Sequence, residues 1–399
     1  MLYFELFSWF IFACKVLSTN GDDGVASSSL TKILKTSYDK RVKPFGRNGT
    51  LDLEVQISVV AVGPINEKDF TFRLDYYLRQ WWVDERLVFP EKGKITFGGN
   101  PKDLIWLPDL FVRNSKEVKM HQSFQQSIRT TINHDGNVYM SARISSICSC
   151  NMNLQNYPMD HQTCALSMES YAYQGNELNI SWHQAPIEYK PENIQVEGYK
   201  LTSIDASSDV TNYMTGEFFQ LLHIYLHVER TVSYYIFRSY VPSSFLVIMT
   251  WGTFWLPVNT YPARVGIIVT NFLASAFILQ GASAMYTKVP YTTAIEVYLL
   301  VNITFILTVM LEYIAAIQTP NLSKIFKGSR RNIQNIELND TEENGSTLLN
   351  TKETDYKSGQ NDVQKDAKSG HPLDRLSRYV FPSMYVVFLI CYFISYSNL

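Results

Sequence analysis

The chain has 399 residues, of which 46% are hydrophobic and 18% charged, and its formal net charge is −2. This length is enough for two domains, and the near-neutral charge without a basic stripe or zinc-type cluster argues against a nucleic-acid partner. The seven histidines are scattered, and no phosphate-binding glycine loop, Ser–His–Asp set or metal motif has convincing spacing, so we predict no enzyme, cofactor or metal site.

The N-terminal stretch, residues 2–17, is almost wholly apolar and is followed by a polar run. This outline is typical of a secretory signal, although Glu5 stands where a basic residue is usual. A short buried helix is the alternative interpretation. We expect residues 1–20 to be a signal peptide and residues 21–230 to fold in an oxidising compartment.

Five cysteines fit that route. Cys14 lies in the signal and Cys391 in a late apolar segment, which leaves Cys148, Cys150 and Cys164. Because three cysteines cannot all pair with one another, we expect one disulfide and one free thiol.

Residues 51–229 show short strand patterns separated by turn residues. Apolar and polar residues alternate in 51–57 and 72–76, and residues 134–137 form a plausible hairpin turn. Such strands without helical periods predict an immunoglobulin-like antiparallel β-sandwich. Asn48 and Asn179 begin glycosylation sequons.

After Arg230 the composition becomes strongly apolar. Four segments, residues 234–256, 265–286, 294–317 and 379–396, are each near the roughly 20 residues that a membrane-spanning helix needs. We therefore expect a four-helix transmembrane bundle, with helices one to three in residues 231–318 and the fourth in 376–399.

A polar segment, residues 319–375, separates the third span from the fourth and predicts a largely disordered loop. Lys324, Lys327, Arg330 and Arg331 follow the third span, which places this loop in the cytoplasm. Four spans then leave the N-terminal domain and the C-terminus outside the cell, as in a multi-pass plasma-membrane protein.

Several short sequence motifs can be recognised along the chain. Cys150 and Cys164 bracket thirteen residues that contain Tyr-Pro-Met-Asp at 157–160, and Trp-Leu-Pro-Asp stands at 106–109. Further motifs are RQWWVDERL at 79–87, YPARVG at 261–266 and RYVFP at 378–382.

Together these motifs resemble the Cys-loop (pentameric) ligand-gated ion channels, closest to the anion-selective GABA- and glycine-type receptors. The resemblance extends over nearly the whole mature chain. It implies that Cys150, rather than Cys148, pairs with Cys164, and that this loop touches the membrane helices.

The resemblance also implies an agonist site between neighbouring subunits. The positions that match on its principal face are Phe111, Glu169, Ser170, Tyr171, Tyr213, Thr215 and Phe218. Those that match on the opposing face are Tyr77, Arg79 and Ser141. Aromatic faces attract a cation by about 0.5–2 kcal/mol each, Glu169 can pair with an ammonium, and Arg79 can bind a carboxylate.

Without the resemblance, these residues have simpler interpretations. Aromatic residues in strands are more often core, Arg79 would be a solvated strand residue, and Glu169 an exposed charge. With it, the Tyr-x-Thr-Gly-x-Phe run that begins at Tyr213 is closest to GABA-type receptors.

The partners expected are a small amine or amino-acid agonist, membrane lipid, and either identical subunits in a homopentamer or related subunits in a heteropentamer. The alternative function is a receptor-like subunit that needs a partner subunit or answers to a monoamine, protons or a lipid.

For the second span the resemblance selects one stripe as pore-lining. Its members are Gly266, Thr270, Leu273, Phe277, Gln280 and, at the outer end, Ala284. Pro262, Ala263 and Arg264 are the pore residues expected at the inner mouth. The helical pattern alone cannot choose between this stripe and the one with Asn271, Ser275 and Ser283.

On the selected stripe, Leu273 is the expected hydrophobic gate. Because no acidic residue precedes Arg264, we expect its charge and the helix N-termini to favour chloride. The alternative is that Arg264 only anchors the helix. Phe277 and Ser283 depart from the usual residues of anion channels and suggest low conductance.

Coupling between binding and gating is assigned by the resemblance to charged residues at the junction of the two domains. These are Glu67, Lys68, Asp69, Asp160, Arg230 and Lys288. Alternatively, they only hold the domains together.

Overall fold

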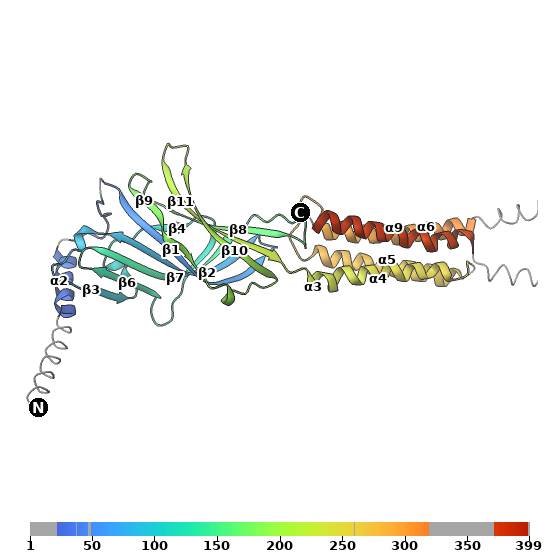
Figure 1. The fold of residues 1–399 in the computed structure, drawn as a ribbon, viewed down its shortest axis with the longest axis horizontal. Helices are drawn as coiled ribbons and strands as arrows, with labels where there is room; N and C mark the ends of the chain where they lie inside the picture. The colour runs from blue at the N-terminus through green and yellow to red at the C-terminus, as the bar shows by residue number, and fades with distance from the viewer. Residues whose placement is uncertain (1–21, 37, 47–48, 259, 319–370, 398–399) are drawn as a thin grey trace, which may run out of the picture. The chain divides into compact units, whose positions relative to one another are not determined.

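The structure is a computed structural model that describes residues 22–36, 38–46, 49–258, 260–318 and 371–397. The chain divides into two compact units (Figure 1). The first contains Met1–Asn153 and His161–Arg230, and the second contains Leu154–Asp160 and Thr231–Leu399. The predicted signal peptide, the sequon at Asn48 and most of the predicted cytoplasmic loop lie outside the described residues.

The first unit is built from two β-sheets. The seven-stranded sheet runs in the order β3 (Lys94–Gly98), β6 (Ile128–Asn133), β7 (Asn137–Ser149), β2 (Thr71–Val83), β1 (Leu51–Asn66) and β9 (Leu178–Glu188), with β5 (Ser115–Met120) paired to β7. The four-stranded sheet runs in the order β10 (Tyr199–Asn212), β11 (Phe218–Arg230), β8 (His161–Ser170) and β4 (Leu110–Val112).

Alternation of apolar and polar residues produces this sandwich. On β1, Leu51, Leu53 and Val55 are buried, whereas Asp52 and Glu54 are exposed. Successive side chains of a strand point to opposite faces, so the strand buries one face and solvates the other. The predicted β-sandwich is therefore confirmed, as is the hairpin turn at 134–137, which joins the antiparallel strands β6 and β7.

Two features of this unit differ from the sequence-based expectation. The sheets are not wholly antiparallel, since β1 and β9 run parallel. A helix, α2 (Asp22–Thr36), precedes the sandwich. This helix was not predicted from the sequence, because it contains few large apolar residues. Leu30, Ile33 and Leu34 nevertheless fall at helical spacing.

The cysteines are as predicted in number and pairing. Cys150 and Cys164 form the disulfide, with an S–S distance of 2.04 Å, and Cys148 is a buried free thiol. Burial raises the pKa of the Cys148 thiol to about 12, so it stays protonated at neutral pH.

The second unit is helical. Among the residues that the structure describes, three helices are long and apolar enough to cross a membrane: α5 (Tyr261–Ser283), α6 (Ala294–Gln318) and α9 (Pro372–Ser397). The first predicted span is instead a run of short pieces: α3 (Ser233–Tyr235), a π-helical turn (Ile236–Tyr240), α4 (Val241–Trp251) and a 3-10 turn (Gly252–Trp255). Pro242 lacks an N–H group, and the π turn lies directly before it.

The helices share one apolar core. It contains Val247 and Phe254 from the first span, Ile268 from α5, Ile306 and Val309 from α6, and Tyr385 from α9. Arg238, the one charge in the first span, is exposed and its guanidinium carbon lies 5.7 Å from the centre of the Tyr234 ring.

The tip of the disulfide loop belongs to this helical unit. Tyr157 is buried, with its ring centre 4.9 Å from that of Tyr286 and 5.2 Å from that of Tyr235. The backbone N–H groups of Ala294 and Ile295, at the start of α6, donate to carbonyls of the loop. The loop tip thus covers the start of α6 and meets the first span.

Candidate functional site

A cleft of about 270 Å³ lies where β4, β8 and the β10–β11 hairpin meet. Its walls come from eight residues that share an aromatic or polar side chain: Phe111, Glu169, Ser170, Tyr171, Tyr213, Thr215, Glu217 and Phe219. Phe111 stands directly opposite Glu169 in the register of β4 and β8. The structure therefore gathers six of the seven residues predicted for the principal face.

Glu169 is the charged centre of this cleft. Its side chain is almost fully buried, and Oε1 accepts a hydrogen bond of 3.2 Å from the Tyr213 hydroxyl. The Nε of Arg113 lies 3.8 Å from the same oxygen. Oε2 is buried and has no hydrogen-bond partner among the described residues. A buried carboxylate oxygen requires a donor, so this atom is a natural acceptor for an ammonium ligand.

Aromatic rings stand around that carboxylate. Phe111 and Tyr171 meet edge to face at 5.7 Å, and Tyr213 meets Phe219 in the same manner at 5.5 Å. Tyr171 is 80% exposed. An uncovered ring of this size offers its face to a cation or to another chain.

Phe219, not Phe218, lines the cleft. Neighbouring residues of β11 point to opposite faces, and the ring of Phe218 packs against Gly175, where a Cβ would collide with it. The Tyr-x-Thr-Gly-x-Phe run ends at Phe218, which is why Phe218 was predicted from the sequence, whereas the lining residue in the structure is its neighbour Phe219.

Ser170 is held by its own chain. Its hydroxyl donates to Asp109 at 2.6 Å, and the other oxygen of Asp109 accepts the Ala172 N–H at 2.6 Å. Asp109 belongs to the Trp-Leu-Pro-Asp motif. The motif therefore fixes the loop that follows β8. The Ser170 hydroxyl proton is used in this contact with Asp109 and is not free for a ligand in the cleft.

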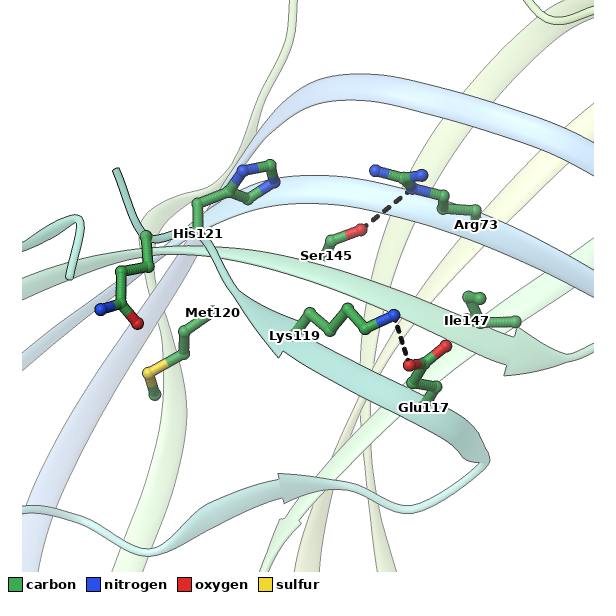
Figure 2. Close-up of a pocket in the computed structure, with 8 residues that line it drawn as sticks. Arg73, Glu117, Lys119, Met120, His121, Ser145 and Ile147 are labelled. Atoms are coloured by element: carbon green, nitrogen blue, oxygen red, sulfur yellow. Dashed lines mark hydrogen bonds and ion pairs between the residues drawn. The ribbon is translucent and has the colours of Figure 1, made fainter. Parts of the chain in front are cut away.

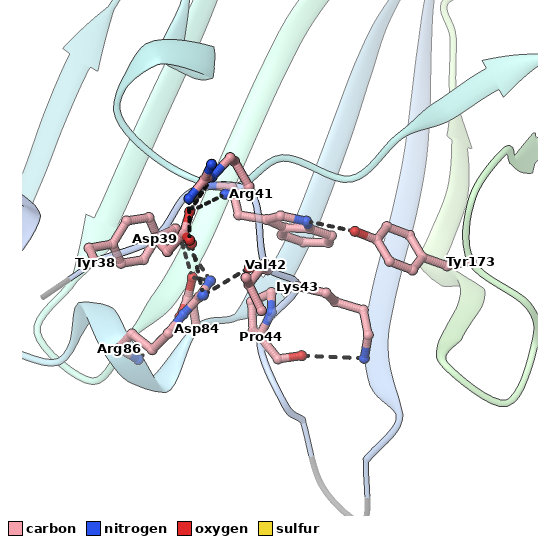
Figure 3. A network of polar contacts seen from close by, with 10 residues as sticks. Tyr38, Asp39, Arg41, Val42, Lys43, Pro44, Asp84, Arg86 and Tyr173 are labelled. Carbon is pink, nitrogen blue, oxygen red and sulfur yellow. Dashed lines mark hydrogen bonds and ion pairs between the residues drawn. The ribbon is translucent and has the colours of Figure 1, made fainter.

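A polar network extends this support to the N-terminal segment (Figure 3). The Tyr173 hydroxyl accepts from the Trp106 indole at 3.3 Å, and the Trp106 backbone N–H donates to Tyr38 at 2.9 Å. Tyr38 donates to the buried Asp84, which Arg86 binds through two nitrogens at 2.8 Å each. Burial raises the pKa of Tyr38, so its hydroxyl remains a donor. The network ties residues 38–44 to the loop beside the cleft.

The opposing-face residues lie on the seven-stranded sheet. Tyr77 and Arg79 are two apart on β2, and Arg79 pairs with Ser141 of β7 in the strand register. The guanidinium of Arg79 donates to Glu188 at 2.6 Å and to Gln56 at 2.9 Å. Neither of these partners was predicted from the sequence.

A second hollow, of about 220 Å³, lies on the same sheet between β5, β7 and β2 (Figure 2). Its charges are matched within the chain, since Arg73 pairs with Asp75 at 3.2 Å and Lys119 with Glu117 at 2.5 Å. Within the described part of the chain no group of three or more His, Cys, Asp or Glu residues could hold a metal ion.

The two stripes of α5 differ clearly within the subunit. The exposed residues among those predicted for the pore are Pro262, Ala263, Gly266, Thr270, Leu273, Phe277, Gln280 and Ala284. The other stripe is packed: Ser275 is buried, and the Asn271 amide donates to Thr250 at 2.9 Å. Ser283 donates to Glu296 of α6 at 3.1 Å.

Arg264 is a correction to the predicted pore residues. Its side chain is 1% exposed and lies inside the bundle, where it donates to both oxygens of Asp374 on α9, at 3.0 and 2.7 Å. It also donates to the Leu256 carbonyl and stands 5.2 Å from the centre of the Tyr313 ring. Arg264 is therefore buried and paired within the subunit, where it ties α5 to α9 and is not among the exposed residues of α5.

The predicted coupling residues fall into both units. In the first, the buried Arg230 pairs with Glu67 and stacks on Tyr199, 4.6 Å from its ring centre. Lys68 and Asp69 are in the same turn as Glu67, where Asp69 accepts from Asn66 at 2.8 Å. In the second unit, Asp160 is buried and Lys288 is exposed. Their part in coupling stays a prediction.

The predicted glycosylation site at Asn179 lies on β9. Its amide nitrogen donates to Asp52 and its oxygen accepts from Gln220, each at 2.7 Å. Its modification also stays a prediction.

Comparison with known proteins identifies both units. Residues 27–232 match the neurotransmitter-gated ion-channel ligand binding domain, and residues 239–344 match the neurotransmitter-gated ion-channel transmembrane region. The first match alone covers more than half of the chain.

Individual relatives agree with these matches. The chain is 31% identical to a gamma-aminobutyric acid receptor subunit beta of Caenorhabditis elegans over 72% of its length and 53% of the relative. It is 26% identical to the rho-1 subunit of Homo sapiens over 94% of its length and 86% of the relative. It is 31% identical to the rho-2 subunit of Bos taurus over 70% of its length and 60% of the relative. The chain thus belongs to the neurotransmitter-gated ion-channel family, as a multi-pass plasma-membrane channel subunit with an extracellular ligand-binding domain, and it is not an enzyme.

Proposed function

We propose that this chain forms a chloride-selective pentameric channel that opens when gamma-aminobutyric acid, or a similar small amino acid, binds between two subunits. The principal face of one subunit supplies Glu169 and its aromatic neighbours. The opposing face of the next supplies Tyr77, Arg79 and Ser141. Because one chain carries both faces, identical copies can complete the site.

The unpartnered oxygen of Glu169 is the observation that carries the proposal. This atom is buried, the described residues offer it no donor, and its residue lines a cleft whose walls include Phe111, Tyr171, Tyr213 and Phe219. An ammonium group would satisfy the oxygen and meet aromatic faces at the same time. The names of the relatives supply the agonist class.

Chloride selectivity is supported by what stands at the start of α5. Pro262 and Ala263 are exposed and carry no charge, so five copies provide no acidic ring. The N-terminus of a helix bears a partial positive charge, which remains after the charge of Arg264 has been balanced by Asp374. Replacing external chloride by a large anion should shift the reversal potential as expected for a chloride current. A reversal potential that follows sodium instead would overturn the assignment.

The agonist assignment is tested by removing each charged partner. Loss of one buried charge partner costs about 2–5 kcal/mol, so Arg79→Ala and Glu169→Ala should each raise the half-maximal agonist concentration at least tenfold. Arg73→Ala is the control, because Arg73 lies on the same strand β2, with 45% of its side chain exposed, and has its own acidic partner. If Arg79→Ala and Glu169→Ala both respond like wild type, the ligand binds elsewhere or is not a zwitterion.

Expression of this chain alone tests the assembly. Current under a panel of small amines and amino acids would support the homomeric channel. Surface protein without current would contradict it and favour the subunit that needs a partner.

A further inference from the structure

The end of β9 brings an acidic side chain to the proposed carboxylate-binding arginine. Oε2 of Glu188 lies 2.6 Å from a guanidinium nitrogen of Arg79. The Arg79 side chain is 27% exposed and that of Glu188 is 56% exposed. Within the single subunit Glu188 is thus exposed and Arg79 is partly exposed.

A bulge in β9 creates this contact. Val55 of β1 pairs with Trp182 and Ile57 with Ile187, so residues 183–186 stand opposite the single residue Gln56. The Gln56 amide donates to the Ala185 carbonyl at 2.7 Å, and its oxygen accepts from Arg79 at 2.9 Å. Gln56 thus fixes the bulge and the guanidinium together. Bulges commonly re-aim a side chain beside a functional site.

We infer that Glu188 is a built-in counter-ion of Arg79 that the carboxylate of an amino-acid agonist must displace. This inference rests on the proposed function, in which Arg79 binds that carboxylate. Glu188 accepts from Nη1 of Arg79. A guanidinium can bind a carboxylate end-on through its two terminal nitrogens, so the ligand carboxylate and Glu188 compete for Nη1. Agonist binding then exchanges one carboxylate for another at Arg79 and releases the end of β9 from β2.

Glu188 leaves Arg79 at low cost, and only a ligand with a carboxylate can take its place. Glu188 is more than half exposed, so it returns to water without a large desolvation cost when it leaves Arg79. An amine without a carboxylate has nothing to offer Arg79, and the pair with Glu188 then persists. The internal pair therefore lowers the affinity for carboxylate-bearing ligands only, because the apparent affinity is the intrinsic affinity multiplied by the fraction of time for which Arg79 is free of Glu188.

The test uses the full-length channel, purified as the pentamer, and two probes. Calorimetry measures the dissociation constants of gamma-aminobutyric acid and of propylamine, which lacks the carboxylate, for wild type, Glu188→Gln and Glu188→Ala. Both variants remove the competing ion pair with Arg79. Because exposed ion pairs are weak, we expect the affinity for gamma-aminobutyric acid to rise by only about two- to fivefold in both variants. The affinity for propylamine should stay unchanged.

Glu54→Gln is the matched control. Glu54 lies on β1, its carboxylate pairs with His183 at 2.6 Å, and it is as exposed as Glu188. Its removal should leave both affinities at the wild-type values.

Each other outcome overturns a defined statement. Unchanged affinity for gamma-aminobutyric acid in both Glu188 variants, with Arg79→Ala still impaired, removes the counter-ion role and keeps the proposed site. Weaker binding in the Glu188 variants would make Glu188 a ligand contact instead. If Arg79→Ala binds gamma-aminobutyric acid as wild type does, the proposed site itself is wrong.

Discussion

The two long sides of α5 (Tyr261–Ser283) use different chemistry. On one side the polar groups have partners inside the subunit: Arg264 binds Asp374, and Asn271 binds Thr250. On the other side large apolar residues are left uncovered, with Leu273 51% and Phe277 70% exposed.

We propose that the uncovered side is the one that meets the neighbouring subunits and the pore. Polar groups in a membrane must find donors or acceptors within the protein. On the packed side Arg264 and Asn271 have found them, whereas the buried Ser275 hydroxyl has no partner among the described residues. The uncovered side also carries Thr270 and Gln280, which would be poorly placed against lipid alone. A symmetric assembly with a water-filled pore would explain why apolar and polar side chains are both uncovered on this side.

Breaking the packed side should have the largest effect. Asp374→Asn leaves Arg264 buried without its counter-charge, which typically costs about 3–5 kcal/mol. We expect loss of most surface channel, measured by surface biotinylation, and a lower melting temperature of the pentamer.

The double variant Arg264→Met with Asp374→Leu is the control. Replacing a whole buried pair by apolar side chains is often neutral, so surface expression should return. An Asp374→Asn channel that reaches the surface and melts like wild type would contradict the anchoring role of this pair.

On the uncovered side, Leu273→Thr should open the closed pore to water. Five equivalent side chains change together in a symmetric pentamer, and a bias of about 1.4 kcal/mol across the ring shifts the gating equilibrium tenfold. We expect leak current without agonist and a half-maximal agonist concentration about tenfold lower, measured by voltage clamp. A folded surface channel with no leak and an unchanged dose response would mean that the other side lines the pore.

Phe277→Thr sharpens the same comparison with a smaller expected effect. Phe277 is the bulkiest uncovered residue of the stripe, so its ring of five is the candidate obstacle to ion flow. Single-channel recording should show a conductance increase of about two- to threefold with little leak, if apolar constriction limits conduction there. An equal loss of closed-state stability in both variants would show that the two rings form one gate.

The smallest change is expected for Ser275→Ala. The Ser275 hydroxyl is buried and has no hydrogen-bond partner among the described residues. Removing an unsatisfied hydroxyl should be neutral or slightly stabilising, within about 0.5 kcal/mol, whereas Asn271→Ala loses a made hydrogen bond and should cost about 1 kcal/mol. Thermal melting of the two variants tests this order, and a larger loss for Ser275→Ala would reverse the assignment of the two residues.

The sequence by itself determined what depends on local pattern. Alternation along 51–57 was enough to predict a half-buried strand, and apolar length was enough for the membrane spans, although Pro242 divides the first one into pieces. The motifs around Cys150 and Cys164 indicated the family, and through it the residues that line the aromatic cleft, while the gate stripe stays a prediction.

Only the tertiary structure decided which charged groups meet. Asp374 lies 110 residues from Arg264, and Glu188 lies 109 residues from Arg79. Neither spacing contains a signal, because such partners come together only when whole helices or strands pack. The choice of Phe219 over Phe218 depends in the same way on which face of β11 turns toward the cleft. Long-range packing thus made Arg264 an anchor and gave Arg79 a counter-ion of its own.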